Sequence, residues 1–480
     1  MQLVLFVALI FGLFVLSNKW PLITFWITLN LYFDPAGFLK EHIGVSVIGP
    51  IKMTDFLFLM LLWTFYRLFE GKISLSSYDM LYKRFLTYLI FLVFYYFIVN
   101  LWLVPLSLGR GDLWLDNFID GRRVIYVIAM GYMVYKVFSR FGGKLLFIIV
   151  LYTAAISFAL FFISYLLKIE LVPIFTFDRY GDGSLMRTGM ASYGLFYWLI
   201  FWGWIFVFLK SGANNSDRTV FKWTLFLFTI FVIVLLMTYT RRTYLELAIT
   251  PVLIYVIVNK CTNINVGIMK IGGVFIVLTG VLAILTPDLL QGSKRIMKDS
   301  FLLAFTGKDS QGERNYRVEG TGDLLLTKEY IKQNPIFGNG YYYFNYDDKD
   351  KGVLGDRMTR FAIASDAARE VPIYNVFFER GIVGFLIYIP FYIFTISVGW
   401  RLYNLMRRYF KILMALDWYS VVFSIMILTI LLQMFTVKIY TLFGTYLEPI
   451  YMIYMSILFA CYLRAKVIIC NYEEKVNHIN

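Results

Sequence analysis

The chain has 480 residues, of which 60% are hydrophobic and 20% aromatic, and its formal net charge is +14. This composition excludes a soluble globular protein, because no soluble domain needs so much apolar surface. Apolar runs of about 15 to 25 residues instead predict many membrane-spanning helices, whereas a membrane barrel would show alternating segments of about 10 residues. We therefore expect an all-α polytopic membrane protein.

The predicted spans follow one another along the chain, mostly with short loops between them. They lie at about residues 3–16, 20–33, 54–69, 85–106, 124–137, 145–166, 191–208, 223–237, 244–258, 272–285, 374–398, 418–435 and 447–462. The first two runs are short and are either full spans or partly re-entrant segments, so the total is about 12 or 13. Because the first run lacks a basic flank and a cleavage site, we interpret it as a retained segment.

Basic residues fall in alternate loops, and this asymmetry predicts the orientation of the chain. The basic set comprises Lys72, Lys83, Arg84, Lys136, Arg140, Lys144, Lys210, Arg218, Lys222, Lys260, Lys270, Arg401, Arg407, Arg408, Lys411, Arg464 and Lys466. Since short basic loops stay in the cytoplasm, we place these loops there. The net charge then reflects membrane orientation and does not indicate a nucleic-acid partner.

Three parts are predicted: an N-terminal bundle of about nine or ten spans over residues 1–286, a large polar loop over 287–373, and C-terminal spans with a cytoplasmic tail over 374–480. The loop carries 13 Lys and Arg and 13 Asp and Glu, and falls on the outer side. Its pattern predicts a helix that ends at Gln333, before Asn334-Pro335, and then a turn at Gly338-Asn-Gly340.

Arginines occur where the orientation requires no cation. Arg241 and Arg242 lie in a tight outer turn between two spans, and Arg122 and Arg123 open another span. We expect the second pair to extend toward lipid headgroups or water. In the first pair, adjacent side chains point in different directions, so we expect one guanidinium to face the protein interior, where its fork suits a phosphate group.

A further basic pair lies in the large loop. Arg314 and Arg317 share a face if this stretch is helical. One interpretation is a solvated loop in which Glu313 and Glu319 neutralise them. The other is that they join Arg241 in a cradle for an anion at the outer membrane boundary, where the pyrophosphate of a polyprenyl lipid is the natural candidate.

Two carboxylates are candidates for a general base. Asp366 and Glu370 are four residues apart and would share one face of a helix. Either carboxylate could take the proton of an attacking sugar hydroxyl. The alternative is a surface helix that enters the membrane.

Other chemistries have little support. His42 and His478 are isolated, the three cysteines have no metal-ligand spacing, and no phosphate-binding loop of the nucleotide type is present. We therefore expect neither a metal nor a cofactor. A transporter would require ionisable groups at mid-membrane, and the predicted spans contain few.

Three segments carry a resemblance to a known family. They are Thr238-Tyr-Thr-Arg241-Arg242, then Arg317 with the following helix and Asn334-Pro-Ile-Phe-Gly-Asn-Gly340, and finally Glu379-Arg-Gly381-Ile-Val-Gly384. In combination they resemble the motifs of the O-antigen ligase and O-antigen polymerase superfamily. The order of the segments and the single large late loop are also similar.

This resemblance implies a metal-independent glycosyltransferase of the GT-C type in the inner membrane, with its active face in the periplasm. Its donor would be an undecaprenyl-pyrophosphate-linked glycan, and Arg241 or Arg242, together with Arg317, would bind the pyrophosphate. A chain-length regulator is a further implied partner.

One departure separates the two branches of the superfamily. Ligases of this superfamily have a histidine eleven residues before the first glycine of their Gly-x-x-Gly motif. In this chain, Glu370 occupies that position. We therefore expect a polysaccharide polymerase that inverts the anomeric centre, with Glu370 or Asp366 as the base. A ligase, a transporter of lipid-linked oligosaccharides and a non-catalytic membrane scaffold remain the alternatives.

Overall fold

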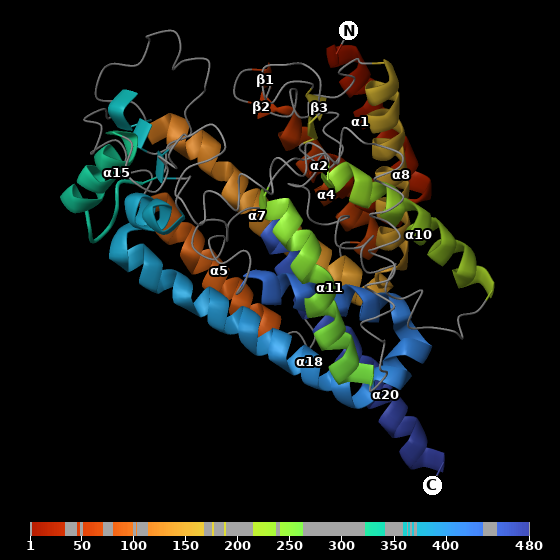
Figure 1. Ribbon diagram of the computed structural model, residues 1–480. Coiled ribbons are helices and arrows are strands. Elements are labelled where there is room, and N and C mark those ends of the chain that lie inside the picture. The colour runs from red at the N-terminus through yellow and green to blue at the C-terminus, as the bar shows by residue number, and fades with distance from the viewer. Residues whose placement is uncertain are drawn as a thin grey trace.

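The structure is a computed structural model, and it describes residues 2–33, 46–48, 51–70, 80–98, 102, 114–167, 175–176, 187–188, 215–236, 241–262, 322–340, 359–361, 363–364, 367–368, 372–434 and 449–479. The described chain is almost entirely α-helical, as the sequence predicts. Figure 1 shows a bundle with α15 and the short strands toward one end and the C terminus at the other.

The described part of the N-terminal half consists mainly of helices (Figure 1). These helices are α1 (Gln2–Lys19), α2 (Pro21–Phe33), α4 (Met53–Phe69), α5 (Met80–Ile98), α7 (Trp114–Phe141) and α8 (Lys144–Leu167). Two small antiparallel ribbons accompany them: β1 (Ser46–Ile48) with β2 (Ile51–Lys52), and β3 (Phe175–Thr176) with β4 (Arg187–Thr188).

The described residues of the second half form two long helical elements and three shorter helices, besides a few helical residues between 359 and 368. They are α10 (Asn215–Leu236), α11 (Arg241–Thr262), α15 (Gly322–Gln333), α18 (Pro372–Met434) and α20 (Pro449–Ile479). The helix predicted to end at Gln333 is present as α15. The backbone of α18 leaves helical geometry at Gly381, Tyr409 and Asp417, so this element is a series of helices joined by breaks.

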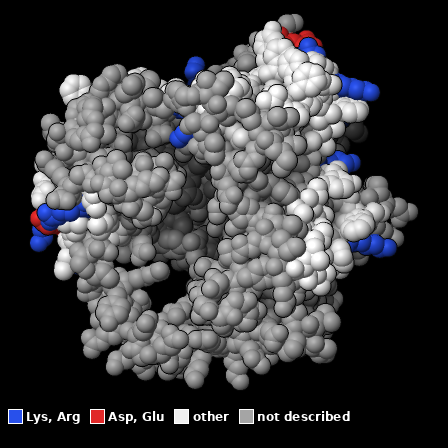
Figure 2. Space-filling view, turned by 90° about the horizontal axis from the view of Figure 1, so that it is seen from above, with Lys and Arg blue, Asp and Glu red and all other residues white. Residues whose placement is uncertain are grey.

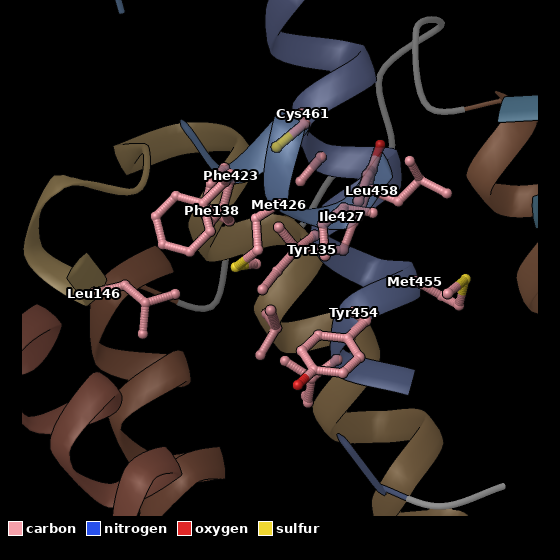
Figure 3. Close-up of a cluster of buried hydrophobic side chains, with 14 of the residues drawn as sticks. Tyr135, Phe138, Leu146, Phe423, Met426, Ile427, Tyr454, Met455, Leu458 and Cys461 are labelled. Atoms are coloured by element: carbon pink, nitrogen blue, oxygen red, sulfur yellow. The ribbon is translucent and has the colours of Figure 1, made fainter. Parts of the chain in front are cut away.

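The bundle is organised around α20. Every residue from Tyr451 to Cys461 is buried, polar ones included, which is the pattern of a helix surrounded by other helices. Figure 3 shows Tyr454, Met455 and Leu458 of α20 beside Tyr135 and Phe138 of α7 and a group from α18. The core is therefore the place where α7, α18 and α20 meet.

The apolar character of the helices agrees with a membrane location. Among the described residues, four segments are long and apolar enough to cross a membrane: Val124–Phe141, Lys144–Ser164, Tyr374–Met434 and Tyr451–Lys475. Shorter apolar helices occur at Phe6–Lys19, Pro21–Phe33, Lys222–Phe231 and Ile249–Cys261. The first two predicted runs thus form the paired helices α1 and α2. The predicted spans at 191–208 and 272–285 lie outside the described residues.

An ion pair at the C-terminal end connects three helices. The Arg464 guanidinium pairs with the Asp417 carboxylate, and its Nη1 donates to the Ser139 carbonyl at 3.0 Å. Asp417 also accepts hydrogen bonds from the amide and the hydroxyl of Ser420. The Asp417 side chain thereby caps the following helix. These contacts bring together segments that the charge pattern assigns to one side of the membrane. That this side is cytoplasmic stays a prediction.

Candidate functional site

The first of the breaks in α18 lies at Gly381, inside one of the motif segments. Gly381 has φ 60° and ψ −164°, a region that is essentially restricted to glycine. A helical hydrogen bond requires helical dihedral angles at the three residues that it encloses. The break therefore removes the helical partners of the carbonyls of Phe378, Glu379 and Arg380.

A second motif segment supplies replacement partners. The amide of Asn339 donates to the Phe378 carbonyl at 2.6 Å, and the amide of Gly340 donates to the Glu379 carbonyl at 2.9 Å. From another helix, the Tyr95 hydroxyl donates to the Arg380 carbonyl at 3.3 Å. All three carbonyls left by the break are thereby satisfied.

The same turn also serves the far side of the break. The amide of Ile382 donates to the Pro335 carbonyl at 3.0 Å, and the amide of Val383 donates to the Ile336 carbonyl at 2.9 Å. The turn 334–340 is thus inserted between two successive turns of α18. We call the turn 334–340 together with residues 378–384 the motif junction.

Two glycines make this close approach possible. A Cβ atom on Gly338 would lie 2.4 Å from the Arg380 amide nitrogen, and one on Gly381 would lie 2.4 Å from the Ile336 carbonyl oxygen. Both obstacles are backbone atoms, which cannot rotate away. Gly338 also has a positive φ of 78°, so its conformation and its contacts both favour glycine.

A buried amide holds the turn in shape. Asn339 Nδ2 donates to the Tyr330 carbonyl at 3.0 Å and to the Phe378 carbonyl at 3.3 Å. Its Oδ1 accepts a bond from Asn334 Nδ2 at 2.7 Å. Asn339 therefore joins the end of α15, the turn and the first segment of α18 in one network.

A small aromatic core lies beneath the junction. Tyr330, Phe361 and Phe378 contact one another with ring centroids 5.3 to 5.9 Å apart. The buried Thr327 hydroxyl donates to the Ala364 carbonyl at 2.8 Å, which attaches residues 363–364 to α15. The described part of the large loop is therefore docked on the start of α18 (Figure 1).

Two charged side chains are buried at the junction. Glu379 and Arg380 are each less than a tenth exposed, and Glu379 Oε2 lies 3.4 Å from Arg380 Nη2. The Arg380 guanidinium lies over the Tyr388 ring, 4.7 Å from its centroid. A Cβ on Gly384 would lie 2.3 Å from the Cβ of Arg380. The Arg380 side chain therefore fits only because this second glycine of Gly-x-x-Gly has no side chain.

The expectation for Arg122 was wrong. Its guanidinium does not extend toward lipid headgroups or water but binds Asp55 with two hydrogen bonds, Nε to Oδ1 at 3.1 Å and Nη2 to Oδ2 at 2.7 Å. Asp55 also accepts the Lys52 amide at 2.7 Å, which caps α4. The pair joins the starts of α4 and the membrane segment of α7 with two charge-assisted hydrogen bonds, which are stronger than bonds between neutral groups.

The predicted catalytic and phosphate-binding residues are described only in part. Arg241 and Arg242 are the first two residues of α11, in place of the expected tight turn, and their side chains lie outside the described part of the structure. Arg314, Arg317, Asp366 and Glu370 lie outside the described residues altogether. Of the described residues near Asp366, Ala364 and Ala368 are fully buried, whereas Ala367 is partly exposed.

Sequence reasoning missed the roles of Asn339, Tyr95 and Arg380. Asn339 and Arg380 both stood inside quoted motifs, Asn339 between two glycines and Arg380 directly before Gly381, and these positions were the available signal. Tyr95 lies in an ordinary apolar run and gave none.

Within the described ranges, no three His, Cys, Asp or Glu side chains gather as a metal site would require. A scan against models of known protein families and a search of curated proteins each found no match for this chain.

Proposed function

We propose that the chain is a polysaccharide polymerase of the O-antigen type. It would transfer an undecaprenyl-pyrophosphate-linked glycan to the non-reducing end of a lipid-linked repeat unit. The reaction would take place at the outer, periplasmic face of the inner membrane. The resemblance of three motif segments is the basis of the proposal, and the motif junction is the observation that supports it best.

The motif junction supports the proposal because it joins two of these segments into one unit. Gly338 and Gly381 lie more than forty residues apart in the sequence, yet each occupies the space where the other's side chain would be. Rigid elements hold functional groups more accurately than free loops. A junction of this kind would fix the large loop over the membrane end of α18, where a lipid-linked substrate presents its head group.

The start of α11 gives independent support. A helix N-terminus carries a partial positive charge, so cations there are unfavourable and anions favourable. Yet α11 begins with Arg241 and Arg242, and its first turn contains no acidic residue. Bound pyrophosphate would compensate both the arginines and the helix dipole.

The proposed chemistry needs no metal. A carboxylate, Glu370 or Asp366, takes the proton of the acceptor hydroxyl, whose oxygen then attacks the anomeric carbon of the donor with inversion. The bond from that carbon to the pyrophosphate oxygen breaks, and polyprenyl pyrophosphate leaves with the electron pair. Arg241 or Arg242, with Arg314 and Arg317, would stabilise the charge that develops on the leaving group.

The test is polymer formation by single-arginine variants. Arg317→Ala and Arg241→Ala should each abolish polysaccharide ladders while the protein level stays normal. Arg360→Ala is the matched control, because Arg360 is an exposed arginine of the same loop, and its ion pair with Glu329, with the charged atoms 3.8 Å apart, lies on the surface. Ladders of normal length from both variants would contradict the proposal.

A reaction with purified protein distinguishes the polymerase from a ligase. When the protein is given only the lipid-linked repeat unit, a polymerase lengthens it. A ligase leaves it unchanged until a separate acceptor is added.

A further inference from the structure

One face of α18 is exposed and apolar from the junction to the far end of its first membrane helix. The residues on this face are Ile382, Leu386, Ile389, Ile393, Ile396 and Trp400. Their spacing alternates between four and three, so they form one stripe along the helix. The residues of the opposite face, such as Tyr388, Phe391 and Val398, are buried. In a membrane helix, such a stripe is the surface that meets lipid.

The length of the stripe matches a bilayer. At 1.5 Å per residue, the helix rises about 27 Å between Ile382 and Trp400, close to the hydrocarbon thickness of about 30 Å. Trp400 is followed by the exposed Arg401, and this sequence of an aromatic and a basic residue is typical of a membrane boundary. Ile382 then lies at the opposite boundary.

The tip of the inserted turn lies beside the end of the stripe that is formed by Ile382. Pro335 and Ile336 are hydrogen-bonded through their carbonyls to Ile382 and Val383. Ile336 and the next residue, Phe337, are 55% and 51% exposed, although both are large and apolar. The tip therefore continues the stripe at the level where the hydrocarbon begins.

The exposed side of α15 has a different character. The charged residues Glu329 and Lys332 are exposed there together with Leu325, and Arg360 pairs with Glu329. Figure 2 shows basic and acidic side chains together at the edge of the molecule where α15 lies. The exposed side of α15 thus carries charged side chains, whereas the exposed residues Ile336 and Phe337 of the tip carry none.

We propose that Ile336 and Phe337 form a membrane-contacting tip that lies among the acyl chains of the bordering leaflet. The lipid that covers the α18 stripe extends to cover the tip. The motif junction is then held at the level of the membrane surface and does not project into water. This inference is independent of the catalytic proposal, because it rests only on the exposed stripe and the hydrogen bonds to Ile382 and Val383.

Spin-label accessibility in liposomes tests the inference. Phe337→Cys would be labelled in the full chain carrying Cys470→Ser; the other two cysteines, Cys261 and Cys461, are buried. The protein would be reconstituted into phosphatidylethanolamine and phosphatidylglycerol vesicles. Collisions of the label with oxygen, which concentrates in lipid, and with a water-soluble nickel chelate would then be compared. Leu386→Cys is the lipid reference, and Gln333→Cys, exposed four residues before Phe337, is the water reference.

The label at position 337 should prefer oxygen, as the label at 386 does, and the label at 333 should prefer the nickel chelate. Ile336→Cys should repeat the result at 337, which keeps the test valid if one variant fails to fold. A nickel preference at both 336 and 337 would overturn the proposal. Protection from both reagents would overturn it as well, because the tip would then be covered by protein.

Discussion

The amide of Ile382 donates its hydrogen bond to the carbonyl of Pro335, a residue of a distant turn, at 3.0 Å. In an uninterrupted helix it would donate to Phe378. This exchange of partners shows that the turn has entered the hydrogen-bond ladder of α18. A side chain or a water molecule inserted into the ladder is one known cause of a helix kink, and here a backbone segment is inserted.

Gly381→Ala should destabilise the protein strongly. Alanine at φ 60° and ψ −164° costs about 1–3 kcal/mol in backbone strain, and its Cβ would collide with the Ile336 carbonyl. We expect a lower melting temperature in detergent and a lower yield of folded protein. Gly12→Ala in α1 is the control, because an added Cβ there meets nothing within 4 Å. Equal melting temperatures for the two variants would contradict the insertion.

Asn339→Asp should be more harmful than Asn339→Ala. Aspartate retains the shape but loses the donor, so a buried carboxylate would face the carbonyls of Tyr330 and Phe378. Each buried polar group left without a partner costs about 1–3 kcal/mol. Thermal unfolding of the purified variants measures the order, with Gln333→Ala as a neighbouring exposed control. If Asn339→Asp melted like the wild type, the described network would be wrong.

Asp55 and Arg122 should be energetically coupled. Removing either partner leaves a partly buried charge, and hydrogen bonds to charged groups are worth about 1.5–3 kcal/mol. Asp55→Ala and Arg122→Ala should each lower the melting temperature, and the double variant should lower it by less than the sum. Arg67→Ala in α4 is an exposed control. Additive effects would show that the two side chains act separately.

Only one of the two candidate carboxylates should be the base. Replacing a general base by its amide lowers turnover by about 10²–10⁴-fold. We therefore expect such a loss from one of the two variants, Glu370→Gln or Asp366→Asn, but not from both. The melting temperature should stay unchanged. The measurement is the lengthening of a lipid-linked repeat by purified protein, and Glu329→Gln on the surface of α15 is the control. Full turnover by both variants would exclude both residues as the base.

The helices were largely predictable because their signal is local. Apolar length alone located the first helix of α18 and most of the N-terminal helices, and Asn334-Pro335 located the end of α15. The turn at Gly338-Asn-Gly340 was likewise predicted from its glycines, whereas Gly381 was noted only as part of a motif. In each of these cases the physical cause acts within one stretch of sequence.

The pairing of distant segments could not be predicted in the same way. Nothing local states that the turn 334–340 fills the break at Gly381, because the partners are backbone amides and carbonyls that every residue possesses. The Asp55–Arg122 pair was missed for a related reason. From the sequence, an arginine at a membrane boundary is equally compatible with hydration by water and with pairing to a carboxylate. Only the fold brings Asp55 within reach of Arg122.

The central position of α20 has a consequence for biogenesis. Of the described helices, α20 leaves the ribosome last, yet its residues Tyr451 to Cys461 are enclosed by earlier ones. Until α20 is in place, the earlier helices lack these central contacts, and the link that Arg464 makes between Asp417 and Ser139 is missing as well. Quality-control proteases would meet this open intermediate in every chain whose synthesis stops early.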